Sequence, residues 1–353
     1  MKFENSLADV TVLILSHNRH NCLLPALEYW NDLGMKTLVI DESDISFRNA
    51  DKFAFVSYHH IQKNFAERCR IASILLKTKY AIVVSDDELY TPSGLLKMKE
   101  ALDADPKLVS VGGVALAIWK YGPRVAGAWP YRGTFGYEND SNTPLSRIRF
   151  HTGNGKKTHS AFFTSNLNRT EHLKRCLDLY SKAPVIATEA ISILTICAAG
   201  KSKYLRELFW IRNWNEFPKS HANWDRGLYL HDWWRREKGT IRWSKFRTEL
   251  QQSFSEFSDL SQFDEIWDMI LSANEAAQPS INTQGYKSKD WLDTYQARYI
   301  KFFSKKMMKS RNIPMKYERI LEEMILSEVH FNAREVDRAV NIVKRMKPYK
   351  NWK

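Results

Sequence analysis

KYAIVVSDDELYTP, at residues 79–92, joins a run of strand-forming residues to a cluster of acids. Residues 82–84 are the apolar β-formers Ile, Val and Val, and Asp86, Asp87 and Glu88 follow one residue later. Neighbouring carboxylates repel one another, so grouping them costs free energy unless a cation or hydrogen-bond donors hold them. The stretch therefore indicates either a solvated acidic turn or a site that binds a positive group.

Strand-forming and helix-forming runs alternate over the first 115 residues. We expect strands at residues 9–16, 36–41, 53–58, 80–85 and 108–116. The helices expected between them lie at residues 22–33, 65–76 and 93–102. This alternation is typical of βαβ units and predicts an α/β fold with a mostly parallel sheet flanked by helices. Ligands bind beyond the carboxyl ends of the strands in such sheets, which is where the acid cluster falls.

The composition is that of a folded protein in a reducing compartment. Of the 353 residues, 44% are hydrophobic and 26% are charged, which excludes global disorder. The four cysteines form no CxxC or CxxH pair, which argues against a disulfide framework or a zinc knuckle. No apolar run approaches the ~20 residues of a membrane span, and the first ten residues carry no apolar signal core. We expect a cytoplasmic protein, soluble or peripheral on the inner face of the cell membrane.

The rest of the chain divides at about residue 240. Residues 117–185 are rich in Gly, Tyr, Trp and Arg and predict loops and irregular strands over a site, with a helix near 169–180. After residue 243 the pattern is helical and basic. Residues 296–353 hold 15 Lys and Arg against 6 Asp and Glu. Their apolar positions recur near helical spacing, so they suit either a helix on an anionic membrane surface or a helical subdomain packed on the sheet.

The order of the motifs resembles the nucleotide-sugar domain of GT-A glycosyltransferases, in particular the family 2-like group. The matching pieces are TVLILSHNR, KTLVIDES and ERCRIASILLKTKYAIVVSDDELYTPSGL, and the resemblance covers residues 9–116. It implies a Rossmann-like, mostly parallel sheet in a nucleotide-sugar and acceptor domain at residues 1–240. The donor half of that domain would be residues 1–116 and the acceptor half 117–240, followed by a basic helical region at 241–353.

The resemblance also implies which residues bind the donor nucleotide. They are Ser16, Asn18, Arg19, Asp41, Arg68, Arg70 and Asp86. Within this set, Asp41 would contact the base, and Arg68 and Arg70 bracket the place of the arginine in the family's Ala-Arg-Asn motif. Ordinary roles stay open, with Asp41 as a turn residue and Arg68 as a surface charge.

The acid cluster matches the family's Asp-rich metal-binding motif, which is followed by a proline. Pro92 lies four residues after Glu88, as that motif requires. The resemblance implies that Asp87 and Glu88 hold Mn²⁺ or Mg²⁺, both of which prefer oxygen ligands. In the proline register the motif's first acid falls on Ser85, so the choice of ligand among Asp86, Asp87 and Glu88 stays open.

A second match begins at Glu189, where EAISILTICAAGK resembles the family's EDxDLxLRLxxAG segment. An acid in that segment acts as a base on the acceptor hydroxyl, so the resemblance implies that Glu189 is catalytic. Ala190 replaces the second acid of the motif. The alternative is that Glu189 is a first-turn acid favoured by the helix dipole.

The segment after residue 205 is dense in tryptophan and histidine. The family often places acceptor-binding residues and a late metal-binding histidine there. Aromatic faces can stack on sugar rings, so Trp210, Trp214 and Trp224 are expected to bind the acceptor. His221 and His231 are candidates for contact with a pyrophosphate or a metal, with His221 taken as the metal ligand.

These observations favour a metal-dependent glycosyltransferase. It would move a sugar from a nucleotide-diphosphate donor to a glycan or a lipid-linked acceptor, in the synthesis of a surface polysaccharide. The alternatives are a nucleotidyltransferase and a non-catalytic protein that binds polyanions or glycans. A nucleotidyltransferase should carry a glycine-rich loop after its first strand, and residues 16–20 contain no glycine. No nucleic-acid-binding signature is present, so we expect no nucleic-acid partner.

Overall fold

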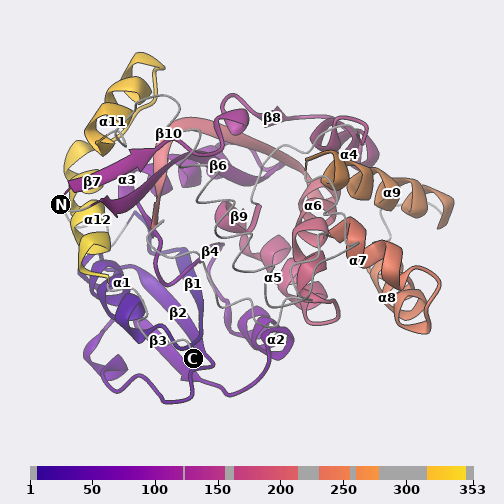
Figure 1. Ribbon diagram of the computed structural model, residues 1–353, viewed down its shortest axis with the longest axis horizontal. Coiled ribbons are helices and arrows are strands. Elements are labelled where there is room, and N and C mark those ends of the chain that lie inside the picture. The colour runs from indigo at the N-terminus through magenta and orange to yellow at the C-terminus, as the bar shows by residue number, and fades with distance from the viewer. Residues whose placement is uncertain are drawn as a thin grey trace.

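Figure 1 presents a computed structural model of the chain, which describes residues 6–121, 124–155, 163–213, 230–254, 260–277 and 316–346. Within these residues a ten-stranded mixed sheet runs in the order β3-β2-β1-β4-β9-β6-β10-β5, with β7 paired to β6 and β8 paired to β10. Helices cover both faces of the sheet. This arrangement confirms the predicted fold class, an α/β fold with a mostly parallel sheet and a helical C-terminal region.

Four parallel strands form the first part of the sheet. They are β1 (Val10–Ser16), β2 (Lys36–Asp41), β3 (Val56–His60) and β4 (Tyr80–Val84). Their apolar runs are those of strands buried on both faces, since Val12 and Ile14 point into one core and Leu13 into the other. All four were expected, although β3 begins three residues later than predicted.

Three helices in this part of the chain lie where they were expected. They are α1 (His20–Asp32), α2 (Phe65–Leu75) and α3 (Pro92–Ala104). The side chain of Asn64 caps α2 and that of Thr91 caps α3, each accepting a backbone N–H of the first turn. Gly34 follows the end of α1 with a φ of +69°, a left-handed conformation that glycine adopts without steric cost.

The second part of the sheet comes from later segments. Its strands are β5 (Leu89–Tyr90), β6 (Leu108–Tyr121), β7 (Arg124–Ala128), β8 (Glu138–Asn139), β9 (Leu167–Arg169) and β10 (Lys201–Asn213). Because β9 is antiparallel to both β4 and β6, and β10 is parallel to β6, the strands β1, β4, β6 and β10 all run in the same direction. Their carboxyl ends therefore lie toward one edge of the sheet.

One face of the sheet carries most of the central and later helices. They are α4 (Pro144–Thr152), α5 (Thr170–Tyr180), α6 (Thr188–Ala199), α7 (Leu230–Glu237), α8 (Ile241–Gln252) and α9 (Leu260–Ala277). Single 3-10 turns lie at Ala50–Lys52, Arg132–Thr134, Phe163–Ser165 and Val185–Ala187. Helix α4 was not expected, because the region around it was predicted to be irregular. Trp233, Trp243 and Trp267 pack together with α5 and α6 in one core, so the core continues across residue 240.

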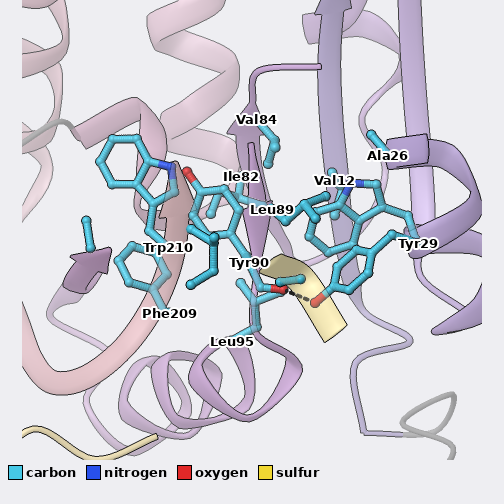
Figure 2. Packing of buried hydrophobic residues seen from close by; sticks show 14 of the residues in the cluster. Val12, Ala26, Tyr29, Ile82, Val84, Leu89, Tyr90, Leu95, Phe209 and Trp210 are labelled. Carbon is cyan, nitrogen blue, oxygen red and sulfur yellow. Dashed lines mark hydrogen bonds between the residues drawn. The ribbon is translucent and has the colours of Figure 1, made fainter. Parts of the chain in front are cut away.

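The opposite face carries α1, α3 and the two last helices, α11 (Tyr317–Leu326) and α12 (Ala333–Arg345). Figure 1 shows both in yellow, with α12 beside α1 and α11 beside β7. Helix α12 packs on α1, and Glu335 accepts hydrogen bonds from the backbone N–H and hydroxyl of Ser93, at 2.9 and 2.7 Å. Figure 2 shows the adjoining core, in which the Tyr29 hydroxyl donates to the carbonyl oxygen of Tyr90.

This packing supports, for residues 316–346, the interpretation as a helical subdomain packed on the sheet. Ile320 and Met324, two of the apolar positions at helical spacing, are buried in the core, while Leu326 is 86% exposed. Arg338 and Arg345 form ion pairs with Asp32 and Glu28 of α1. The two helices are thus a subdomain packed on the sheet, and their buried apolar side chains are not available to a lipid surface. The remaining parts of the predicted membrane segment, residues 296–315 and 347–353, lie outside the described residues.

No helix among the described residues combines the length and the apolarity that a membrane span requires.

Candidate functional site at the carboxyl ends of the strands

The site lies where the order in which successive strands are added to the sheet reverses. Strands β2 and β3 extend from one side of β1, whereas β4 lies on the other side. Such a switch point opens a crevice at the carboxyl ends of the two central strands, and ligands bind there in open α/β sheets. The Ser16 hydroxyl, at the end of β1, donates a 2.9 Å hydrogen bond to Asp86 Oδ2, just past the end of β4. The predicted acid cluster is therefore at the switch point.

Asp86 and Asp87 share one guanidinium group. Arg19 lies just before α1, and its Nη1 is 2.8 Å from Asp86 Oδ1 while its Nη2 donates to Asp87 Oδ2. Both aspartates are more than nine-tenths buried. Burial raises the pKa of the Asp86 carboxyl to about 7, with the charge of Arg19 opposing the shift and that of Asp87 adding to it. We call Asp86 and Asp87 the acid pair.

Glu88, which was predicted to be a metal ligand, does not join the acid pair. Its Oε2 accepts a 3.0 Å hydrogen bond from Trp210 Nε1, and its Oε1 accepts a 2.7 Å bond from Arg212 Nε. Arg212 also donates to the hydroxyl of Tyr131. Burial raises the pKa of the Glu88 carboxyl, and Arg212 opposes that shift. Glu88 therefore ties the turn after β4 to the end of β10.

Trp210 does not present the open aromatic face that was predicted. It is 5% exposed, and the rings of Tyr90 and Tyr131 lie nearly parallel to it at centroid distances of 6.0 and 5.8 Å. Figure 2 shows Trp210 among the core side chains next to Tyr90. A sugar ring cannot stack on an indole that is already covered, so Trp210 supports the site from within the core.

Three other predicted residues, Trp214, Trp224 and His221, lie outside the described residues. His231 is described and lies in α7. It is 2% exposed, and its Nδ1 is 2.9 Å from Asn274 Oδ1 of α9. This contact joins two helices of the core, which is a structural role.

Asp41 ends β2 and is fully buried. Its Oδ1 accepts hydrogen bonds from the backbone N–H and the hydroxyl of Ser43, and its Oδ2 accepts one from the Tyr58 hydroxyl and lies 2.8 Å from His20 Nε2. Burial alone would raise the pKa of this carboxyl, but these donors, led by Ser43, lower it. A carboxylate has about four acceptor positions. All four are in use, so a nucleotide base could bind Asp41 only by displacing a partner.

Asn18 joins the loops that follow β1 and β2. Its backbone has a φ of +52°, which is uncommon outside glycine, and its N–H donates a 2.7 Å bond to the Ser43 hydroxyl. Its side chain accepts from the backbone N–H of Asp44 at 2.9 Å and donates to the Asp44 carboxylate at 3.1 Å. These bonds hold the two loops together beside the acid pair.

Of the two arginines in α2, only Arg68 reaches the strand ends. Its Nη1 donates a 2.9 Å bond to the carbonyl oxygen of Ser16, and its Nη2 lies 2.5 Å from a carboxylate oxygen of Glu42. Burial lowers the pKa of Arg68, and its Nε has no hydrogen-bond partner among the described residues. Arg70 instead pairs with Glu67 on the exposed side of the helix. Arg70 therefore does not belong to the site.

Glu189 lies in the first turn of α6. Only Gly200 separates α6 from β10, so the helix runs back along the sheet and its first turn lies toward the carboxyl ends of the strands. The Glu189 side chain is exposed, and no described residue forms a hydrogen bond or an ion pair with its carboxylate. The protein around it nevertheless desolvates the carboxyl and raises its pKa. A raised pKa makes a carboxylate a stronger base, as a general base requires.

Sequence reasoning missed the residues that hold the acids in place. Arg212 and Tyr131 belong to segments that were predicted to be acceptor-binding or irregular. One signal for the partners of Glu88 was present in the sequence. Trp210 and Arg212 are two residues apart, so in a strand both side chains lie on the same face and can reach one carboxylate. His20 and Ser43, the partners of Asp41, lie next to predicted loops and carry no such signal.

The acid pair could hold a divalent cation in the place that the guanidinium of Arg19 occupies. Two carboxylates converge on a single positive group, and Mg²⁺ is commonly held by one or two carboxylates together with substrate phosphates. Within the described residues, no group of three His, Cys, Asp or Glu side chains could hold a metal ion. A metal here would have Asp86 and Asp87 as its protein ligands, without Glu88.

No protein-family model matches this sequence, and no curated protein matches it. Among solved structures, a crystal structure of S. aureus TarS 1-349 is similar to this chain with a TM-score of 0.41 and 12% identity, over 78% of this chain and 90% of that one. A crystal structure of S. aureus TarS has a TM-score of 0.39 and 11% identity, over 78% of this chain and 55% of that one.

Proposed function

We propose that the protein is a glycosyltransferase that uses a nucleotide-diphosphate sugar as its donor. The observation that carries the proposal is the acid pair at the switch point between β1 and β4. An open α/β sheet binds its ligand at that point, and buried carboxylates there suit a cation that accompanies a diphosphate. The motifs that resemble GT-A glycosyltransferases fall on the same strand ends.

Each group of the site has a role in the proposed reaction. Asp86 and Asp87 would hold Mn²⁺ or Mg²⁺, which would neutralise the charge on the departing nucleotide diphosphate. Arg68 and Asn18 keep the loops after β1 and β2 in place around the nucleotide. Glu189 takes the proton from the acceptor hydroxyl as that oxygen attacks the anomeric carbon.

The acceptor and the cellular setting are part of the same proposal. We propose a glycan or a lipid-linked sugar as the acceptor, and the synthesis of a surface polysaccharide as the process. The net charge of +13 supports an anionic acceptor, because positive charge raises the local concentration of anions.

Donor hydrolysis and transfer across a panel of nucleotide sugars test the proposal. We expect release of a nucleoside diphosphate from at least one donor in the presence of Mn²⁺. Asp87→Asn should abolish this turnover while the protein stays folded, and Glu67→Gln, in an exposed ion pair of α2, should leave it unchanged. Full turnover in excess EDTA would overturn the metal requirement. Release of pyrophosphate from a nucleoside triphosphate and a sugar phosphate would make the protein a nucleotidyltransferase instead.

A further inference from the structure

The two carboxylates that would hold a divalent cation are already bound to Arg19. Nη1 and Nη2 of its guanidinium each contact a different aspartate, and the arginine side chain is 13% exposed. Arg19 takes one oxygen of each aspartate, and the Ser16 hydroxyl takes the other oxygen of Asp86, so a metal ion bound by both carboxylates would compete with Arg19 for them. A guanidinium and a dication cannot occupy the same oxygens, and at that separation they would repel each other strongly.

Arg19 also compensates the negative charge of the acid pair when no metal is bound. Two adjacent, buried aspartates with no cation would be an uncompensated negative charge, which strongly destabilises a fold. Arg19 supplies the missing charge from the loop between β1 and α1, a position at the edge of the site rather than in the core. Its long side chain can reach the acid pair or turn to another anion while its backbone stays in place.

We propose that Arg19 and a divalent cation are alternative occupants of the acid pair. Arg19 holds Asp86 and Asp87 when no donor is bound, and it leaves them when the cation arrives with a diphosphate. The guanidinium then pairs with a phosphate oxygen, which it can bind bidentately. This inference rests on the proposed function for the identity of the diphosphate. The exchange of cations on the acid pair does not depend on it.

The exchange has a thermodynamic signature. The metal alone must displace Arg19 without giving it a new partner, so it binds weakly. A diphosphate provides that partner, so it raises the affinity for the metal in a reciprocal way. Removing the guanidinium should therefore strengthen the binding of the metal alone and weaken its coupling to the diphosphate.

Binding of Mn²⁺ to the nucleotide-free protein tests this, with the free ion measured by electron paramagnetic resonance. Arg19→Gln should bind Mn²⁺ at least about tenfold more tightly than the wild type, and Arg19→Lys, whose single ammonium bridges two carboxylates poorly, should be intermediate. Arg70→Gln, which removes an exposed arginine outside the site, should have no effect. Adding Asp87→Asn to Arg19→Gln should remove the gained affinity.

The same titration is repeated with inorganic pyrophosphate, which should raise Mn²⁺ affinity more in the wild type than in Arg19→Gln. If neither Arg19 variant binds Mn²⁺ more tightly than the wild type, the inference is overturned. If Arg19→Gln fails to fold, Arg19→Lys retains a positive charge and decides the question alone. Tighter Mn²⁺ binding by the variants with no turnover of any nucleotide sugar would reject the proposed function and leave the exchange standing.

Discussion

Two arginines face the three consecutive acids at the end of β4. Asp86 and Asp87 share Arg19, while Glu88 turns to Trp210 and Arg212 of β10. The repulsion between the acids is therefore offset by two arginines from opposite sides of the turn. Because each acid is more than nine-tenths buried, loss of either arginine leaves a buried charge without compensation.

The protonation of Asp86 gives the first prediction. Its pKa of about 7 lies above the ordinary value of an aspartate, so the folded state holds this proton more tightly than the unfolded state does. The stability that Asp86 contributes is then present at low pH and is lost as the pH rises toward 7. In Asp86→Asn this group no longer titrates. We expect the free energy of unfolding of the wild type, minus that of the variant, to fall between about pH 4 and pH 7, by at most about 1.4 kcal/mol per pH unit.

Urea unfolding at pH 5, 6, 7 and 8 measures this difference. Asp103→Asn is the matched control, because hydrogen bonds from Lys79, Lys99 and Tyr80 lower the pKa of Asp103. That carboxyl is ionised in both states across this range, so its wild-type-minus-variant difference should be flat. A flat difference for Asp86→Asn as well would contradict the raised pKa.

Glu189 gives the second prediction at this scale. If it is the base, Glu189→Gln should lower turnover by at least about 10²-fold, because the amide cannot accept the proton of the acceptor, while donor binding persists. Glu171→Gln is the control, since Glu171 occupies the first turn of the neighbouring helix α5 and is exposed. Both variants should lose a similar, small helix-dipole contribution to stability. Equal turnover in the two variants would assign Glu189 to the helix cap alone.

At the scale of elements, α3 and β10 approach each other closely. A Cβ atom on Gly94 would lie 2.5 Å from the Cβ atom of Phe209 and 2.7 Å from the Thr91 hydroxyl oxygen. Thr91 caps α3 and donates a 2.9 Å bond from its hydroxyl to the carbonyl oxygen of Leu208. The same few atoms thus begin the helix and join it to the strand that carries Trp210 and Arg212.

Gly94→Ala should therefore destabilise the protein, although alanine is the better helix former by about 1 kcal/mol. The collision is with atoms close to the backbone of β10, which cannot move aside easily. We expect a net loss of about 1–3 kcal/mol in the free energy of unfolding, measured by urea denaturation. Lys97→Ala, at an exposed position of the same helix, should stay within about 0.5 kcal/mol of the wild type. A stabilised Gly94→Ala would show that β10 can shift.

The elements that could be predicted from sequence are those with a strong local pattern. The strands and helices of the first 115 residues, and α5 and α6, have uninterrupted apolar runs or a regular helical spacing. Strand β10 was not predicted, because its sequence shows no alternation of apolar and polar residues. Its register with β6 is also irregular. The acids at the end of β4 left open a solvated turn or a site for a positive group, and the structure shows them buried beside Arg19 and Arg212. The pairing with Arg19 was not predicted, since Arg19 is 67 positions from Asp86 and meets it only because β1 and β4 are neighbours.

At the scale of the whole molecule, α12 belongs to the core of the first half of the sheet. Val336, Ala339, Val340 and Val343 of this helix are buried in the same cluster as Val12 and Ile14 of β1. Val340→Asp should therefore weaken the entire fold, by about 3–5 kcal/mol, because it buries an uncompensated charge. Unfolding followed by far-UV circular dichroism and by tryptophan fluorescence should shift together.

Leu326→Asp is the control for this prediction, since Leu326 ends the adjacent helix α11 and is 86% exposed. It should change the free energy of unfolding by no more than about 0.5 kcal/mol. An unchanged main transition in Val340→Asp, with only a small loss of helical signal, would mean that α12 unfolds on its own. It would then be an appendage of the sheet domain.

Because α12 docks on α1, the N-terminal half of the fold depends on a helix that is synthesised much later. Ribosomes add about 5–20 residues per second, so α1 leaves the exit tunnel many seconds before residues 333–345 do. During that interval the apolar side of α1 is not yet covered by α12. We expect the nascent chain to bind chaperones through this surface. Folding of the N-terminal half should reach completion only after translation has passed α12.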